Sequence, residues 1–196
     1  MPKRLFFDLT THKQDTILDA AFLEFSRTDF DHSSINQIIK QANIARGSFY
    51  LYFEDKEDLV ITLLKYVLTK QLDTYLQRFV PQKLKPAALY RQFIEFMFEV
   101  FDDVVYASFF KNIYLAMNYR IKKEFDDFAL LFRQRLYDTI QTQSTHGFGQ
   151  RNPPPIAIEI VSLLTRSLFE KKLAYGIAND VLLRHYDDVV SFLIKR

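Results

Sequence analysis

Apolar residues recur at helical spacing along the whole chain. Near the N-terminus, one such stripe predicts an amphipathic helix over about residues 12–27: Ile17, Leu18, Ala21, Phe22 and Phe25. A second, short helix follows with Ser33 as its expected N-cap, and a third is predicted over about residues 45–53. Asn43 lies between these two helices, and Asn tolerates a positive φ better than most residues. Three short helices with a tight turn between the second and third predict a helix-turn-helix domain.

The same periodicity continues beyond this domain. A helix that begins at Asp55 is predicted to reach about Val80, just before two prolines. Later helices are expected over about residues 89–104, 106–118, a long stretch ending near 140, 156–175 and 179–195. We therefore expect an all-α protein of about nine helices, with a helix-turn-helix domain over residues 1–55 and a C-terminal helical bundle over residues 56–196.

The composition agrees with long helices and excludes several classes of protein. Only 4 Gly and 6 Pro occur in 196 residues, so few residues interrupt a helix. The absence of Cys excludes disulfides, thiolate zinc sites and cysteine nucleophiles. The longest apolar run, Phe128–Phe132, has five residues, far from the roughly 20 that a membrane span needs. The first residues also lack the pattern of a signal peptide, so we expect a soluble, cytoplasmic protein with no membrane partner.

No constellation of catalytic or metal-binding residues is present in the sequence. The four histidines, His12, His32, His146 and His185, fall in separate predicted elements without metal-ligand spacing. We find no Ser-His-Asp set, no glycine-rich phosphate loop and no paired carboxylates with a credible pocket. We therefore expect no enzyme activity, no metal and no cofactor.

The third predicted helix has two contrasting faces. Phe49 and Phe53 share one face and are suited to docking inside the protein, whereas Arg46 and Tyr50 share another, with Gly47 beside them. An arginine in this position can reach a phosphate or bind guanine through two hydrogen bonds. Glycine lowers helix stability by about 1 kcal/mol relative to alanine, but it lets a backbone approach another surface closely. This division favours a helix that reads DNA.

The residues around this helix resemble a known family. Residues 46–59 read Arg-Gly-Ser-Phe-Tyr-x-Tyr-Phe-x-x-Lys-Glu-x-Leu, and with the upstream spacing from Ile17 they resemble the N-terminal domain of the tetracycline-repressor (TetR) family. The resemblance covers about residues 12–60. It implies a homodimeric, one-component transcription regulator whose third helix enters the major groove of double-stranded DNA.

The resemblance also implies which residues contact DNA. Tyr50 and Lys56 fall on positions that hold phosphates in the family, and Ser33 and Ser34 on positions that touch the backbone. The expected DNA-binding residues are Ser33, Ser34, Arg46, Gly47, Ser48, Tyr50 and Lys56. A flexible basic arm is expected before and at the start of the first helix: Lys3, Arg4, His12 and Lys13.

The chain departs from the family pattern at four positions and in its charge. Family members usually have Gly at the positions of Asp29 and Asn43, Ala at that of Ile39, and a Ser or Thr cap at that of Ala45. Residues 1–60 contain seven Lys or Arg and ten Asp or Glu, a net charge of −3. These departures leave room for an alternative, a helical ligand-binding or scaffold protein of the same fold without DNA binding. An activator is a further alternative to a repressor.

Beyond the linker, aromatic residues are abundant and allow two interpretations. Such residues at helical spacing usually form core, but family members keep a cavity in this region for an inducer, and the composition suits a small hydrophobic or aromatic ligand. The candidate ligand-binding residues are Phe93, Phe96, Met97, Phe101, Phe110, Tyr114, Met117, Asn118 and Phe128. Asn112 and Asn118 lie in apolar surroundings in the sequence; either can orient a polar group, cap a helix or face solvent.

The last two predicted helices are candidates for a dimer interface. Each carries an apolar stripe, which can be intramolecular core or, as the family resemblance implies, part of a four-helix bundle across a two-fold axis. We expect a homodimer through these helices that binds an inverted repeat and is released by the ligand.

Overall fold

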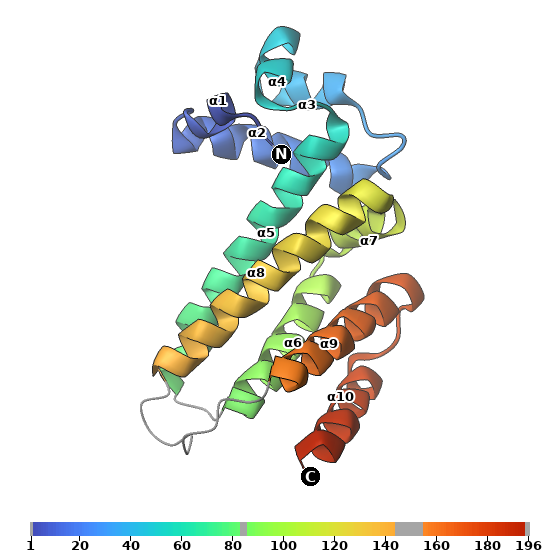
Figure 1. Ribbon diagram of the computed structural model, residues 1–196. Coiled ribbons are helices and arrows are strands. Elements are labelled where there is room, and N and C mark those ends of the chain that lie inside the picture. The colour runs from blue at the N-terminus through green and yellow to red at the C-terminus, as the bar shows by residue number, and fades with distance from the viewer. Residues whose placement is uncertain (1, 83–85, 144–154, 195–196) are drawn as a thin grey trace. The chain divides into compact units, whose positions relative to one another are not determined.

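The computed structural model describes residues 2–82, 86–143 and 155–194 (Figure 1). These residues form ten α-helices and one 3-10 helix and contain no strand, which confirms the all-α prediction. The helices are α1 (Arg4–Phe7), α2 (Thr11–Arg27), α3 (Ile35–Gln41), α4 (Arg46–Tyr52), α5 (Lys56–Phe79), η1 (Val80–Gln82), α6 (Pro86–Asp102), α7 (Ala107–Leu115), α8 (Tyr119–Gln143), α9 (Pro155–Tyr175) and α10 (Asn179–Ile194). Within this part of the chain no helix is long and apolar enough to cross a bilayer.

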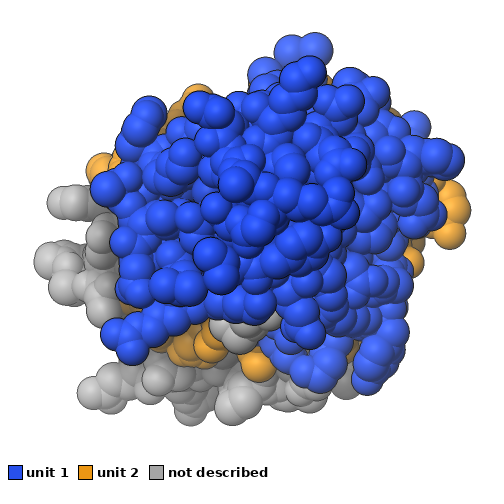
Figure 2. Space-filling model, turned by 90° about the horizontal axis from the view of Figure 1, so that it is seen from above, with its two compact units in different colours: residues 1–70, 104–129 blue, residues 71–103, 130–196 orange. Residues whose placement is uncertain are grey.

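The chain forms two compact units, coloured separately in Figure 2. Unit 1 contains residues 1–70 and 104–129, and unit 2 contains residues 71–103 and 130–196. Helices α5 and α8 each begin in unit 1 and end in unit 2. Unit 1 thus includes, besides the N-terminal helices, more than half of α5, all of α7 and the start of α8.

Unit 1 is built around the buried face of α2. Thr10 caps this helix by accepting a hydrogen bond from the backbone N–H of Lys13, and the predicted apolar stripe of α2 faces inward. Helix α7 packs on α2, where the rings of Phe22 and Phe109 lie 4.9 Å apart. Helix α3 packs on another part of α2, and Ile38 of α3 is fully buried. α2 therefore supports both α3 and α7.

A buried carboxylate joins α2 to α3. The side chain of Glu24 is almost completely inaccessible, yet it accepts hydrogen bonds from the guanidinium of Arg27 and from the backbone N–H of Ser34 at 2.8 Å. These donors replace the water that the carboxylate loses on burial. The start of α3 is thus attached to the last turns of α2.

The predicted flexible N-terminal arm is wrong. Residues 4–7 form the additional helix α1, whose Phe6 is buried with its ring 4.9 Å from that of Phe53. The backbone N–H of Lys3 donates to the carbonyl of Tyr52, and its ammonium donates to the carbonyl of Tyr50 at 2.7 Å. Four residues are too few to show helical periodicity, so only the short apolar run over residues 5–7 could have indicated this docking.

Unit 2 contains a buried aromatic cluster around Tyr75. The hydroxyl of Tyr75 donates to the backbone carbonyl of Leu89, and its ring contacts those of Phe93 and Phe96. Helix α10 packs on α6 and α9 and buries Tyr186, and Arg91 of α6 binds Asp187 of α10 at 2.8 Å. Helix α10 is therefore held by both apolar packing and an ion pair.

Burial of Tyr186 predicts a specific alkaline destabilisation. Burial, with the nearby Asp187 carboxylate, raises the pKa of Tyr186 to about 12. A tyrosine in the unfolded chain ionises near pH 10, so between about pH 10 and 12 only the unfolded state loses this proton. Folding stability should fall with rising pH by up to about 1.4 kcal/mol per pH unit from this group. Urea unfolding at pH 8, 10 and 11 should show a shallower decline for Tyr186→Phe than for the unaltered protein.

Tyr175 provides the matched control, because its side chain is 76% exposed. Tyr175→Phe should keep the pH dependence of the unaltered protein. An equally steep decline in Tyr186→Phe would show that this hydroxyl is not the source.

Candidate nucleic-acid interface

Helices α3 and α4 pack against each other through their apolar sides. Ile38, Ala42 and Phe49 are fully buried. Asn43 has a φ of 49° and provides the left-handed residue of the turn, where the TetR pattern has Gly. The backbone N–H of Ile44 then donates to the carbonyl of Ile39 at 3.0 Å. This packing leaves the opposite sides of both helices on the surface.

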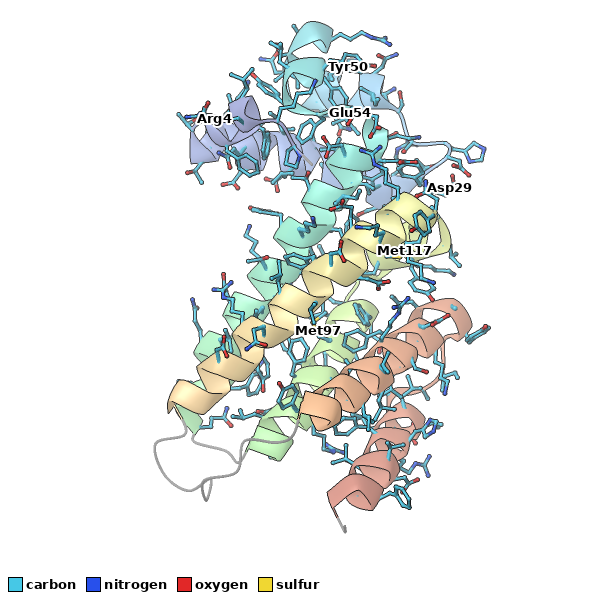
Figure 3. All side chains as sticks on the ribbon, viewed as in Figure 1. Arg4, Asp29, Tyr50, Glu54, Met97 and Met117 are labelled. Carbon is cyan, nitrogen blue, oxygen red and sulfur yellow. The ribbon has the colours of Figure 1, made fainter. Side chains whose placement is uncertain are left out.

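The outward side of α4 carries the residues that the sequence singled out. Arg46, Gly47 and Tyr50 are exposed, and Ser48 is half-buried. Figure 3 shows Tyr50 on α4, directed away from α5. Apart from its two chain neighbours and the nearby backbone of α4 itself, a Cβ placed on Gly47 would meet no atom of the described residues within 4 Å. Packing inside the described protein therefore does not require glycine at position 47, although glycine destabilises a helix.

Helix α3 contributes polar side chains to the same surface. Asn36, Gln37 and Lys40 are exposed, and the guanidinium of Arg46 donates to the Oδ1 atom of Asn36 at 3.0 Å. Asn36 was not among the predicted site residues. The i, i+1, i+4 spacing of these three polar residues, opposite the apolar side of α3, was the sequence pattern that could have indicated it.

Ser33 and Ser34 differ in their surroundings. The Ser33 side chain is buried, and its hydroxyl donates to the carbonyl of Phe30 at 2.6 Å. Ser34 is half-buried and occupies the N-cap position of α3, where its backbone N–H is bound by Glu24. The structure thus gives the hydroxyl of Ser33 an internal role, whereas Ser34 lies at the surface beside α3.

Lys56 has internal partners as well. Its ammonium donates to the carbonyls of Phe30, Asp31 and Ser33, and it lies 4.5 Å from the centre of the Phe30 ring. Burial lowers the pKa of Lys56 despite the opposing effect of nearby Asp31. The first residue of α5 therefore holds the loop between α2 and α3.

This loop is also closed by Asp29. The carboxylate of Asp29 accepts from the backbone N–H of His32 at 3.0 Å and contacts the ring Nδ1 of the same residue at 2.8 Å. The hydrogen bond from the His32 backbone, followed by that from its ring, lowers the pKa of Asp29. A carboxylate turn thus replaces the glycine that the TetR pattern has here.

The predicted ligand-binding residues are divided between the two units. Four belong to unit 2 and are buried: Phe93, Phe96, Met97 and Phe101. Five belong to unit 1: Phe110, Tyr114, Met117, Asn118 and Phe128. Among these, Phe110 is buried, but Asn118 is exposed rather than surrounded by apolar groups, because it caps the start of α8. Figure 3 labels one residue of each group, Met97 and Met117.

The predicted dimer helices have both inward and outward apolar residues. Leu168 of α9 and Leu182 and Tyr186 of α10 are buried. Leu163 of α9 and Phe192 of α10 are 58% and 63% exposed. The described residues also contain no group of three or more His, Asp or Glu side chains that could hold a metal ion.

Comparison with known proteins agrees with this architecture. Residues 17–63, from α2 into α5, match the family model described as bacterial regulatory proteins, tetR family. The uncharacterized HTH-type transcriptional regulator YvdT of Bacillus subtilis (strain 168) is 40% identical over 73 residues, 37% of this chain and 35% of that protein. The fatty acid metabolism regulator protein of the same organism is 43% identical over 49 residues, 25% of each chain. These matches span about a third or less of the relatives' length.

Similarity to solved structures extends over nearly the whole chain but concerns the fold alone. FadR from Bacillus subtilis, in complex with stearoyl-CoA, has a TM-score of 0.61 at 19% identity and covers 91% of this chain and 96% of its own. A TetR transcriptional regulator from Rhodococcus sp. RHA1 has a TM-score of 0.64 at 13% identity and covers 94% and 95%. Together, these comparisons show a helix-turn-helix of the tetR family over residues 17–63, sequence similarity to transcriptional regulators in this region, and a shared fold over nearly the whole chain.

Proposed function

We propose that the protein is a repressor that binds an inverted-repeat operator as a homodimer and is released by a small hydrophobic ligand. The observation that carries the DNA-binding part is the outward side of α4, where Gly47 lies between exposed Arg46 and Tyr50 with open space beside it. Glycine there is explained by the close approach of an external surface. The width of the DNA major groove accommodates such a helix.

The individual residues take different roles in this proposal. Arg46 reads base edges, with its guanidinium oriented by Asn36, and Tyr50 and Ser48 bind phosphates. Ser34 binds the DNA backbone from the start of α3. Ser33 and Lys56 act indirectly, because their polar groups already bind the loop that carries Ser34.

The charge distribution of the N-terminal region favours DNA contacts made by both cations and neutral donors. Exposed Lys40 and Arg46 lie within residues 32–53, a segment that contains no acidic residue. The acidic residues of the N-terminal region lie mostly on α2 and around the start of α5. We therefore propose a modest release of counterions per subunit on binding.

The dimer is proposed to form through α9 and α10. Both helices expose a large apolar side chain, Leu163 and Phe192, that a partner copy would cover. A two-fold axis would place two copies of α4 at a fixed spacing, as an inverted repeat requires.

The ligand is proposed to be a fatty acyl compound. The buried aromatic cluster of unit 2, with Tyr75, Phe93 and Phe96, is suited to long apolar chains. Two similar proteins support a fatty acyl ligand: FadR was solved in complex with stearoyl-CoA, and a relative is described as a fatty acid metabolism regulator protein. A ligand that favours one spacing of the two α4 helices would shift the dimer between its bound and free states.

An operator selection tests the DNA-binding proposal. Purified protein incubated with a random duplex library should enrich an inverted repeat whose half-sites lie about one or more helical turns apart. Arg46→Ala should lose about 1–3 kcal/mol of binding free energy and relax the preference at one base pair per half-site. Fluorescence anisotropy with the enriched sequence and single-base variants measures both effects.

Lys123 is the control, because it is exposed on α8 and pairs with Asp127 of the same helix. Lys123→Ala should bind the enriched sequence like the unaltered protein. Failure to enrich any repeat would favour the alternative, a ligand-binding protein without DNA binding.

Substitution of Gly47 by Ala should raise folding stability but lower DNA affinity. Gly47→Ala adds a methyl group where the described protein leaves space, so it should stabilise folding by about 1 kcal/mol through helix propensity. The same methyl group faces the DNA and should reduce operator affinity at least tenfold. Urea unfolding and operator titration give the two values.

Ala45→Ser is the matched comparison, because Ala45 has the extended backbone of an N-cap residue and no capping side chain. It should stabilise α4 by about 1 kcal/mol and keep operator affinity. Gly47→Ala with undiminished affinity would place this side of α4 away from DNA.

The ligand proposal can be tested on the protein–operator complex. Stearoyl-CoA added at micromolar concentration should dissociate the complex, whereas coenzyme A without an acyl chain should leave it intact. Anisotropy of labelled operator measures the release. Equal effects of the two compounds, or no effect of either, would rule out recognition of the acyl chain.

A further inference from the structure

The segment that carries α3 and α4 is attached to α7 and α8 at both of its ends. This segment, residues 29–55, begins where α2 ends and finishes where α5 begins. Side chains of α7 and of the start of α8 bind residues 25–28 before it and residues 54–57 at its far end. Figure 3 shows Met117, in the corner between α7 and α8, on the side of α8 nearest Asp29 and Glu54.

Asn112 of α7 makes the first attachment. Its side-chain amide lies 3.0 Å from the carbonyl of Phe25, 3.3 Å from that of Ser26 and 3.2 Å from that of Thr28. The last carbonyls of a helix lack partners within the helix, so this amide supplies donors where α2 needs them. The end of α2 is thereby fixed to α7.

Arg120, in the first turn of α8, makes the second attachment. One nitrogen of its guanidinium binds the carboxylate of Asp55 and lies 3.2 Å from that of Glu57, and another lies 3.7 Å from that of Glu54. Asp55 also caps α5 by accepting from the backbone N–H of Asp58 at 2.7 Å. A single carboxylate therefore serves as the cap of α5 and as the partner of α8.

Asn118 strengthens this second attachment. Its Oδ1 atom caps α8 by accepting from the backbone N–H of Ile121 at 3.0 Å, and its amide donates to the carboxylate of Glu57. The residue that caps each helix, Asp55 for α5 and Asn118 for α8, is thus bonded to a side chain at the start of the other helix. Exposed ion pairs contribute little one at a time, but this set joins several charged and polar groups in one network. Burial would raise the pKa of Asp55, yet the hydrogen bonds from Arg120 and from the Asp58 backbone lower it.

The segment between the attachments is internally braced. Lys56 binds carbonyls of residues 30, 31 and 33, so the far end of the segment is bonded to its near end. α3 and α4 are packed together through Ile38 and Phe49. A braced segment held at both ends has an orientation set by those two ends.

We propose that Asn112, Asn118 and Arg120 are positioning residues for DNA binding: together they form a clamp on both ends of the helix-turn-helix that sets the angle of α4. The part of this proposal that concerns DNA rests on the proposed function. Because α8 continues beyond residue 129 into unit 2, a displacement of α8 would reach α4 through this clamp. None of the three residues needs to touch DNA for this role.

Hydrogen exchange on the free protein tests the clamp without DNA. Arg120→Ala should accelerate exchange of the backbone amides of residues 46–58 at least fivefold, while the thermal unfolding midpoint moves no more than in Lys123→Ala. Asp55→Asn removes the charge of the cap but keeps capping, since Asn caps as well as Asp. It should accelerate exchange of the same amides. Unchanged exchange in both variants would overturn the proposal.

Operator binding tests the consequence. Arg120→Ala should weaken binding about tenfold without changing the dependence of affinity on salt, because no phosphate contact is lost. A salt slope reduced by about 1 would make Arg120 a phosphate contact instead and would overturn its role as a positioning residue. Arg120→Lys, which keeps the charge but cannot bridge several carboxylates, should lie between the unaltered protein and Arg120→Ala.

A double-mutant cycle measures the coupling between Arg120 and Asp55. The losses of operator affinity caused by Arg120→Ala and Asp55→Asn should not add. The double variant should bind operator no more than twofold more weakly than whichever single variant binds more weakly. Full additivity would show that the two residues act separately and would contradict the clamp. If the unaltered protein enriches no operator, the proposed function fails, and the exchange experiment still decides whether the clamp holds residues 46–58.

Discussion

The proposed DNA-binding surface depends on burial beneath two helices that are too short to be stable alone. α3 and α4 have seven residues each, whereas isolated helices shorter than about 12 residues are marginal in water. Their stability comes from Ile38, Ala42 and Phe49, which are fully buried. Since these side chains point inward, the polar residues between them must point outward. The interface is therefore a consequence of how the core is packed.

Polar groups then fix the orientation of α3 and α4 relative to the rest of unit 1. The buried carboxylate of Glu24 fixes the start of α3, and Lys56 fixes the loop before it. Both residues are charged, but they act through backbone groups inside the protein. A charged residue in a DNA-binding motif thus does not have to face DNA, and Lys56 shows why a motif position alone cannot distinguish contact from support.

Helices α5 and α8 are the parts of the fold that both units share. Each is long enough, with 24 and 25 residues, to pack in unit 1 with one end and in unit 2 with the other. Both N-terminal ends meet at Asp55, Glu57 and Arg120. The proposed ligand response requires only that a change in unit 2 be transmitted along one of these helices, which a continuous hydrogen-bonded helix can do.

Much of this protein could be predicted from its sequence because helical periodicity and helix signals are local. The nine predicted helices, the turn at Asn43 and the outward position of Arg46 and Tyr50 all follow from spacing within a few residues. The partners of a side chain are not local, and that is where prediction was incomplete. The docking of α1, the internal role of Lys56 and the bond from Asn118 to Glu57 depend on residues far away in the chain. Sequence by itself determined the helices and the faces they bury, since these depend on neighbouring residues; only the tertiary structure decided which polar groups support the interface, because burial and hydrogen-bond distances exist only once distant segments meet.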